Sequence, residues 1–228
     1  MANTIRHHFL IVARLGAVLV VFLGIGFFVK SPPVASAQST GPATGDQSLL
    51  TAARQGDKET IKKCITSGAD LNVRDARGNT PLHLACIYGH IEIAKLLLAA
   101  KADYEIMTNE EISPLFTASF FCNVDMVKLL LAHGADATTT DKNGTPLVKV
   151  MAAQWEVMQG IYQAICPIVG VEFNAKHFRE TRPIVHQLLG DQLVKRWDSD
   201  PQQISVHSGR TKEPTASEWT VSDVRATH

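Results

Sequence analysis

One sequence pattern recurs along this chain at an interval of 33 residues, and it restricts the fold to a stack of similar units. Its clearest copy runs from Asn79 to Ala100 and reads NTPLHLACIYGHIEIAKLLLAA. The triplet Ser113-Pro114-Leu115 repeats Thr80-Pro81-Leu82 at this interval. A unit of this length cannot bury its apolar residues alone, so we expect each copy to pack on its neighbours.

Each copy predicts two short helices joined by a tight turn. Thr80 supplies a capping oxygen and Pro81 suits the first helical turn, where no amide donor is needed. Gly89 suits a left-handed turn, and the apolar run from Ile91 to Leu98 predicts a second helix. The unit is therefore a helix-turn-helix.

These motifs together resemble the ankyrin repeat: the TPLH box, the Gly-His turn, the KLLL run and the Gly-Ala-Asp terminator. The resemblance implies an all-α ankyrin-repeat solenoid, with repeats at about 48–74, 75–107 and 108–140 and a divergent fourth unit at 141–189. It is strong from Leu49 to Leu147 and weak beyond. We expect residues 154–169 and 181–189 to form helices of a modified C-terminal cap.

The N-terminal 37 residues have the pattern of a secretory signal peptide. Arg6 and Arg14 precede an apolar run from Leu15 to Val29, and Ala35 and Ala37 are the small residues that a signal peptidase reads. We therefore expect cleavage after Ala37 and export to a bacterial periplasm. The alternative is an uncleaved segment that anchors the protein in the inner membrane.

Charge argues against nucleic acid and against an acidic membrane surface as partners. The chain has 22 Lys and Arg against 22 Asp and Glu. Three of the basic residues and none of the acids lie in the first 37 residues, which leaves 19 basic and 22 acidic side chains after cleavage, a net charge of −3. We expect a monomer that touches no membrane beyond its signal or anchor.

Two polar segments flank the repeats. Residues 38–47 are expected to form a flexible linker, and residues 190–228 a polar, disordered tail. Within the tail, residues 203–207 and 218–221 alternate in polarity and could pair as strands or serve as a docking peptide.

The third repeat departs from the pattern. Cys122 stands where the second repeat has Gly89, and Phe116 replaces His83, a side chain that in ankyrin repeats ties neighbouring turns by hydrogen bonds. We expect this repeat to be looser or differently packed.

The sequence predicts neither a catalytic centre nor a cofactor or metal site. It contains no HExxH, GxSxG, CxxC or phosphate-binding glycine loop. His83 and His90 occupy positions where ankyrin repeats use histidine structurally, and the four cysteines are expected to be buried free thiols. An enzyme would need a site in the divergent cap, where the candidates are Glu156, Glu172, His177 and Glu180.

A partner-binding surface is expected on the concave face of the stack. Residues just before each Gly-His turn form a ladder of apolar side chains flanked by an arginine: Arg54, Gln55, Ile87, Tyr88, Phe120 and Phe121. A polar rim is expected at the turn tips: Arg77, Asn79, Glu110, Ile112, Lys142 and Asn143. The alternative is that Phe120 and Phe121 fold inward or are covered by the C-terminal cap.

The resemblance therefore implies an exported, non-catalytic protein-protein interaction module with an unidentified protein partner. Two more specific versions remain open. One is an inhibitor or immunity-type protein that occludes an exported enzyme or toxin, and the other is an assembly or protective factor for a periplasmic complex.

Overall fold

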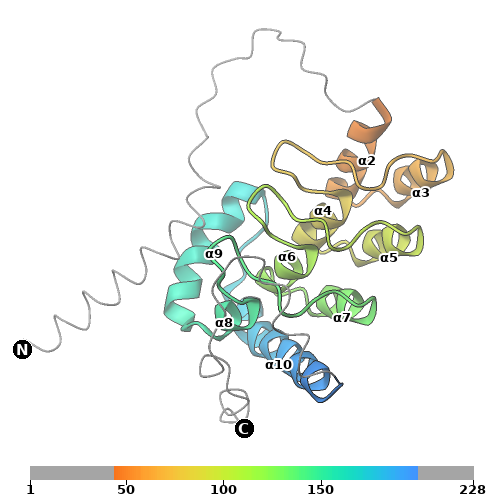
Figure 1. Cartoon of the computed structure of the whole chain (residues 1–228). Helices are drawn as coiled ribbons and strands as arrows, with labels where there is room; N and C mark the ends of the chain where they lie inside the picture. Colours follow the sequence, from red (N-terminus) through yellow and green to blue (C-terminus); the bar gives the residue numbers. More distant parts are fainter. Residues whose placement is uncertain (1–43, 200–228) are drawn as a thin grey trace, which may run out of the picture.

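The helices of the described part of the chain, backbone residues 44–199, lie in two rows (Figure 1). The first-helix row contains α2 (Thr44–Gln55), α4 (Pro81–Tyr88), α6 (Pro114–Phe120) and α8 (Leu147–Ala152). The second-helix row contains α3 (Lys58–Thr66), α5 (Ile91–Ala99), α7 (Val124–Ala132) and α10 (Ala175–Ser199). In this computed structural model, neighbours within each row contact one another. The predicted all-α repeat fold is confirmed.

One helix belongs to neither row. α9 (Trp155–Val169) is inserted between α8 and α10, the two helices that complete the fourth unit. The second-helix position of that unit is taken by α10, which packs on both α7 and α8. The fourth unit is therefore a repeat interrupted by an additional helix.

The first helices begin where the sequence predicts, because Thr80 and Ser113 cap them. The Thr80 hydroxyl accepts from the amide of His83, and the Ser113 hydroxyl accepts from the amide of Phe116 at 3.1 Å. Gly89 ends α4 in the left-handed conformation, with φ at 72°.

His83 joins two repeats through a single tautomer. Its Nδ1 accepts from the amide of Thr80, which leaves the proton on Nε2 to be donated to the carbonyl of Ile112 at 3.0 Å. His90 bonds the carbonyl of Arg54 in the preceding repeat at 3.1 Å. Both histidines are therefore structural, as predicted.

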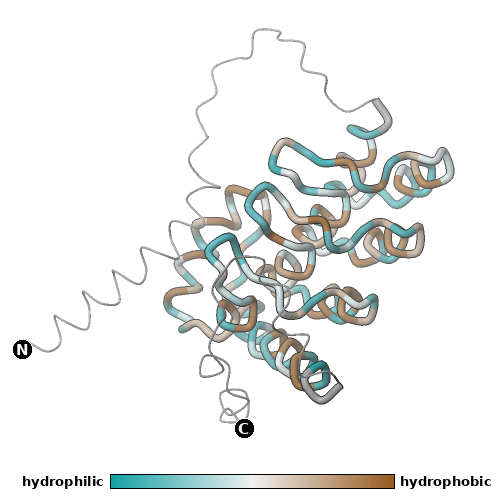
Figure 2. The backbone as a smooth tube through the Cα atoms, in the orientation of Figure 1, coloured by the Kyte–Doolittle hydropathy of each residue, from teal (hydrophilic) through white to brown (hydrophobic). Residues whose placement is uncertain are grey.

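The core runs the length of the stack between the two rows, and Figure 2 shows apolar residues recurring at matching places of successive helices. Leu82, Leu97, Leu115 and Leu130 are fully or almost fully buried within it. Each such side chain contributes roughly 1.5–3 kcal/mol through burial.

In the second and third repeats, three residues other than glycine hold left-handed backbone. Lys101, Glu111 and Cys122 have φ values of 68°, 59° and 55°. Each stands 33 residues from a glycine with positive φ in a neighbouring repeat, such as Gly89 for Cys122. The third repeat thus keeps the left-handed backbone of its neighbours at Glu111 and Cys122 without glycine, and the expectation that it is looser or differently packed stays a prediction.

Three segment boundaries differ from those predicted. α2 begins at Thr44, within the expected linker. α8 forms despite its divergent sequence, because Leu147 and Met151 are buried. α10 begins at Ala175 rather than 181 and continues to Ser199, within the segment expected to be disordered. Phe178, Val185 and Leu189 give it a buried face, which outweighs the cost of Pro183 inside the helix.

The predicted signal peptide, its cleavage site and tail residues 200–228 lie outside the described residues. Between residues 44 and 199, no helix combines the length and apolar character that crossing a bilayer requires.

Replacing Lys101 with glycine is expected to stabilise the protein. A side chain in left-handed backbone costs about 1 kcal/mol, and glycine removes that cost. Urea unfolding should show a free energy of unfolding raised by about 1 kcal/mol. The control is Lys95→Gly within α5, which should lower it by about 1 kcal/mol. A loss of stability in Lys101→Gly would show that its backbone conformation is not strained.

His83 should make the fold sensitive to mild acid. Burial lowers its pKa from 6.5 to about 4, so the unfolded chain binds the proton more readily. The contribution of His83 to the free energy of unfolding is complete above pH 6.5 and is lost as the pH falls toward 4. The loss amounts to about 3 kcal/mol, because each pKa unit corresponds to about 1.36 kcal/mol. NMR titration of the His83 ring checks this, and a midpoint near 6.5 would contradict it.

Candidate functional site

α9 lies against the first-helix row, on the face where the sequence predicts a binding surface. Its middle contacts the third repeat, where the rings of Tyr162 and Phe120 have centroids 5.1 Å apart. Its C-terminal end reaches the second repeat, where the Tyr88 hydroxyl donates to the carbonyl of Val169 at 2.9 Å. The chain itself thus occupies part of the predicted binding surface.

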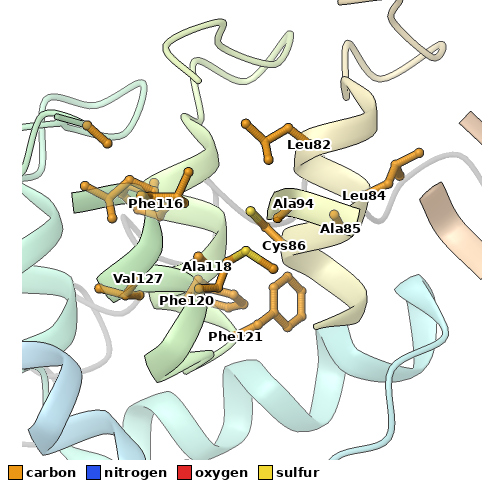
Figure 3. Close-up of a cluster of buried hydrophobic side chains, with 14 of the residues drawn as sticks. Leu82, Leu84, Ala85, Cys86, Ala94, Phe116, Ala118, Phe120, Phe121 and Val127 are labelled. Carbon is orange, nitrogen blue, oxygen red and sulfur yellow. The ribbon is translucent and has the colours of Figure 1, made fainter. Parts of the chain in front are cut away.

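Phe120 and Phe121 are buried, so the prediction that they belong to an exposed apolar ladder is wrong. Their exposed fractions are 3% and 8%, and their rings meet edge to face with centroids 5.3 Å apart. Figure 3 shows both rings at the end of α6, where they lie between α4 and the ribbon of α9. The alternative that the C-terminal cap covers them is therefore the correct one.

An aromatic cluster secures α9 to the rest of the fold. Tyr162 packs on Phe178 of α10 and on Phe173 of the intervening loop, with ring centroids 4.3 and 6.3 Å away. Met158 and Cys166 are buried on the same face of α9. At roughly 1.5–3 kcal/mol for each buried side chain, this packing makes α9 a structural element.

A buried arginine holds the interrupted unit together. Arg182 of α10 is 7% exposed, and its Nη2 donates to the carbonyls of Val150 and Ala153, at the C-terminal end of α8. A cation at this end of a helix satisfies carbonyls that have no partner within the helix. Burial lowers the pKa of Arg182, and no carboxylate in the described part of the chain forms a salt bridge with it.

Sequence reasoning missed Arg182, although a signal was present. Phe178, Val185 and Leu189 recur at helical spacing, and Arg182 lies four residues after the first of them. It therefore falls on the buried face of α10.

The other half of the predicted ladder remains accessible. Arg54 and Gln55 are exposed at the end of α2, and Ile87 and Tyr88 of α4 are half-buried. The Tyr88 ring also stacks on His90, with centroids 6.1 Å apart. The structure thus keeps the first and second repeats open while closing the third.

The predicted polar rim divides into exposed tips and structural supports. Arg77 and Asn143 are exposed, whereas Asn79 bonds the carboxylate of Asp75 within its own turn. Ile112 is half-buried, and its carbonyl is the acceptor for His83.

Bonds between repeats hold the turns at residues 74–79, 107–112 and 140–145 in fixed positions. We call these turns the second, third and fourth fingers. Lys142 of the fourth finger forms an ion pair with Glu110 of the third. Asn109 of the third donates to the carbonyls of Ala76 and Arg77 in the second, at 3.1 and 3.0 Å. Arg74 donates to the carbonyl of Met107 at 2.7 Å. The fingers are therefore preformed.

The groups considered for catalysis all lie at the surface. Glu156, Glu172, His177 and Glu180 are exposed on α9, the following loop and α10. Burial raises the pKa of the Cys166 thiol to about 11 and also raises that of Cys122, so these thiols stay protonated at neutral pH. All four cysteines are free and buried, and among the described residues no three His, Cys, Asp or Glu side chains could hold a metal ion.

Comparison with known proteins supports the repeat assignment. The family described as ankyrin repeats, in three copies, matches residues 49–141. No curated protein matches the chain. The match covers the first three repeats and stops at the start of the interrupted unit.

Removing a buried ring should destabilise the fold strongly. Phe120→Ala is expected to lower the free energy of unfolding by about 3–5 kcal/mol, because it leaves a cavity between α6 and Tyr162. Urea unfolding measures this, with Gln55→Ala at an exposed site of the same row as the control, expected to change stability by less than about 0.5 kcal/mol. A loss below about 1 kcal/mol in Phe120→Ala would mean that the ring is not core.

Proposed function

Because the chain is an ankyrin-repeat protein, a class of protein-protein interaction module, we propose that it is non-catalytic and that a protein partner docks on its fingers and on the open first and second repeats. This surface takes the place of the full concave ladder, since α9 covers its third-repeat portion.

The observation that carries this proposal is a set of exposed tips on preformed fingers. Arg77 and Asn143 face solvent, while the fingers that bear them are tied to one another by Asn109 and Lys142. A surface already fixed in its bound shape loses little conformational entropy when a partner docks. Rigid fingers with polar tips therefore suit binding by shape.

The proposal that the chain is non-catalytic rests on the chemistry of its side chains as well as on the family match. Raised thiol pKa values disfavour nucleophilic cysteines at Cys122 and Cys166. His83 has both ring nitrogens engaged in structural bonds, which leaves it no free nitrogen for proton transfer.

Export is part of the proposal and rests on the sequence. The basic residues, apolar run and small residues of the first 37 positions form a secretory pattern. If mass spectrometry of the exported protein gave an N-terminus other than Gln38, the proposed cleavage site would be wrong.

A charge reversal at a finger tip should weaken partner capture without affecting the fold. Arg77→Glu, made in the chain 38–228, is expected to retain at least tenfold less of a protein captured from periplasmic extract, because Arg77 lies on the proposed surface. The control is Arg179→Glu, an equivalent change at an exposed site on α10, which should capture normally.

Melting temperatures of both variants should stay within a few degrees of the parent, since exposed substitutions rarely alter stability. Equal capture by Arg77→Glu and Arg179→Glu would move the site away from the fingers. No specific capture by any form would contradict the proposed role in that compartment.

A further inference from the structure

We infer that the end of α9 forms one wall of a docking site for a protein segment that carries an apolar side chain beside a carboxylate. The other walls are the exposed end of α2 and the half-buried end of α4. This inference rests on the proposed function and adds to it the chemistry of the partner. It also gives α9 a role beyond closing the third repeat.

The position of the wall follows from where α9 ends. Gly170 terminates the helix in the left-handed conformation, with φ at 77°, so α9 stops beside α4. Figure 1 shows the end of α9 near α4 and the end of the row at α2 left uncovered. The Tyr88–Val169 hydrogen bond joins the helix end to the second repeat.

The apolar part of the site includes Ile168, a large apolar side chain that is not buried in the core. Ile168 is 43% exposed, and it directly precedes Val169, whose carbonyl is bonded to Tyr88. It also lies seven residues after the buried Ile161, which puts it at the margin of the buried face of α9. Together with Ile87 and Tyr88, it gives the open end an accessible apolar surface.

The charged part of the site is basic. Arg54 has a side chain 55% exposed and only a long, 4.0 Å contact with Asp75, and Arg74 and Arg77 are exposed nearby. Asp75 accepts bonds from the amides of Arg77 and Asn79 within its own turn, so it neutralises these cations only in part.

Two exposed carboxylates, Glu172 after α9 and Asp57 after α2, reduce this positive charge, and the Asp57 carboxylate caps α3 by accepting from the amides of Glu59 and Thr60. An arginine beside an apolar surface suits a carboxylate partner, because guanidinium can bind both carboxylate oxygens. An apolar anchor next to an acid therefore matches both halves of the site.

Two other large apolar side chains of the described residues are equally exposed, and one of them serves as a control. Met107 of the third finger is 46% exposed and Ile184 of α10 is 45% exposed. Ile184 lies on α10 in the second-helix row and is the control, whereas the carbonyl of Met107 accepts a hydrogen bond from Arg74 of the proposed site. Single exposed apolar residues are common on protein surfaces, so exposure alone does not select Ile168.

NMR titration with two synthetic peptides tests the inference. Both carry the same Leu-Trp anchor, flanked in one by Asp and Glu and in the other by Lys, and each is added to the labelled chain 38–228. The acidic peptide should shift the amides of Ile87, Tyr88, Ile168 and Val169 in a saturable way, and the basic peptide should not. Ile168→Glu and Arg54→Glu should each raise the Kd at least tenfold, while Ile184→Glu leaves it unchanged.

Equal binding of the two peptides, shifts centred on another surface, or no saturable shift at millimolar peptide would each overturn the inference. The melting temperature of every variant is measured first, because an exposed site should tolerate the change. If the peptides fail while Arg77→Glu still loses its captured partner, only this inference fails. If that capture also fails, the proposed function fails with it.

Discussion

The packing of α9 on the first-helix row decides what this stack of repeats can present to a partner. Tyr162 joins three elements: it contacts Phe120 of α6, Phe173 of the following loop and Phe178 of α10. Because this contact covers the third repeat, the third-repeat part of the predicted apolar ladder, Phe120 and Phe121, becomes part of the core. The surface that remains available to a partner is then made by the fingers and by the open end of the first-helix row near α2.

The interruption of the fourth unit requires its own structural support. α8 is short and lacks a side-chain cap at its start, and Arg182 satisfies carbonyls at its other end from within α10. α10 in turn completes the second-helix row by packing on α7. The inserted helix is thus accommodated without breaking the stack, since the helices on either side of it still form a repeat pair.

The repeats could be predicted from sequence because their determinants are local. Thr80, Pro81 and Gly89 define a cap, a first turn and a left-handed end wherever they occur in this order. The path of α9 could not be predicted from sequence, because its amphipathic pattern shows a buried face at Tyr162 without showing which surface covers it. The burial of Phe120 depends on where α9 packs, a contact between residues far apart in the sequence. The burial of Arg182 could have been predicted from the helical spacing of Phe178 and Val185.

The contact between α9 and the third repeat is tested most directly by nuclear Overhauser effects in the chain 38–228. The structure predicts cross-peaks between the rings of Tyr162 and Phe120, whose centroids are 5.1 Å apart, and between Tyr162 and Phe178. Cross-peaks of Tyr162 with Phe178 but none with Phe120 would show α9 packed on α10 and detached from the row. The third repeat would then be open, and the full concave ladder would return as the binding surface.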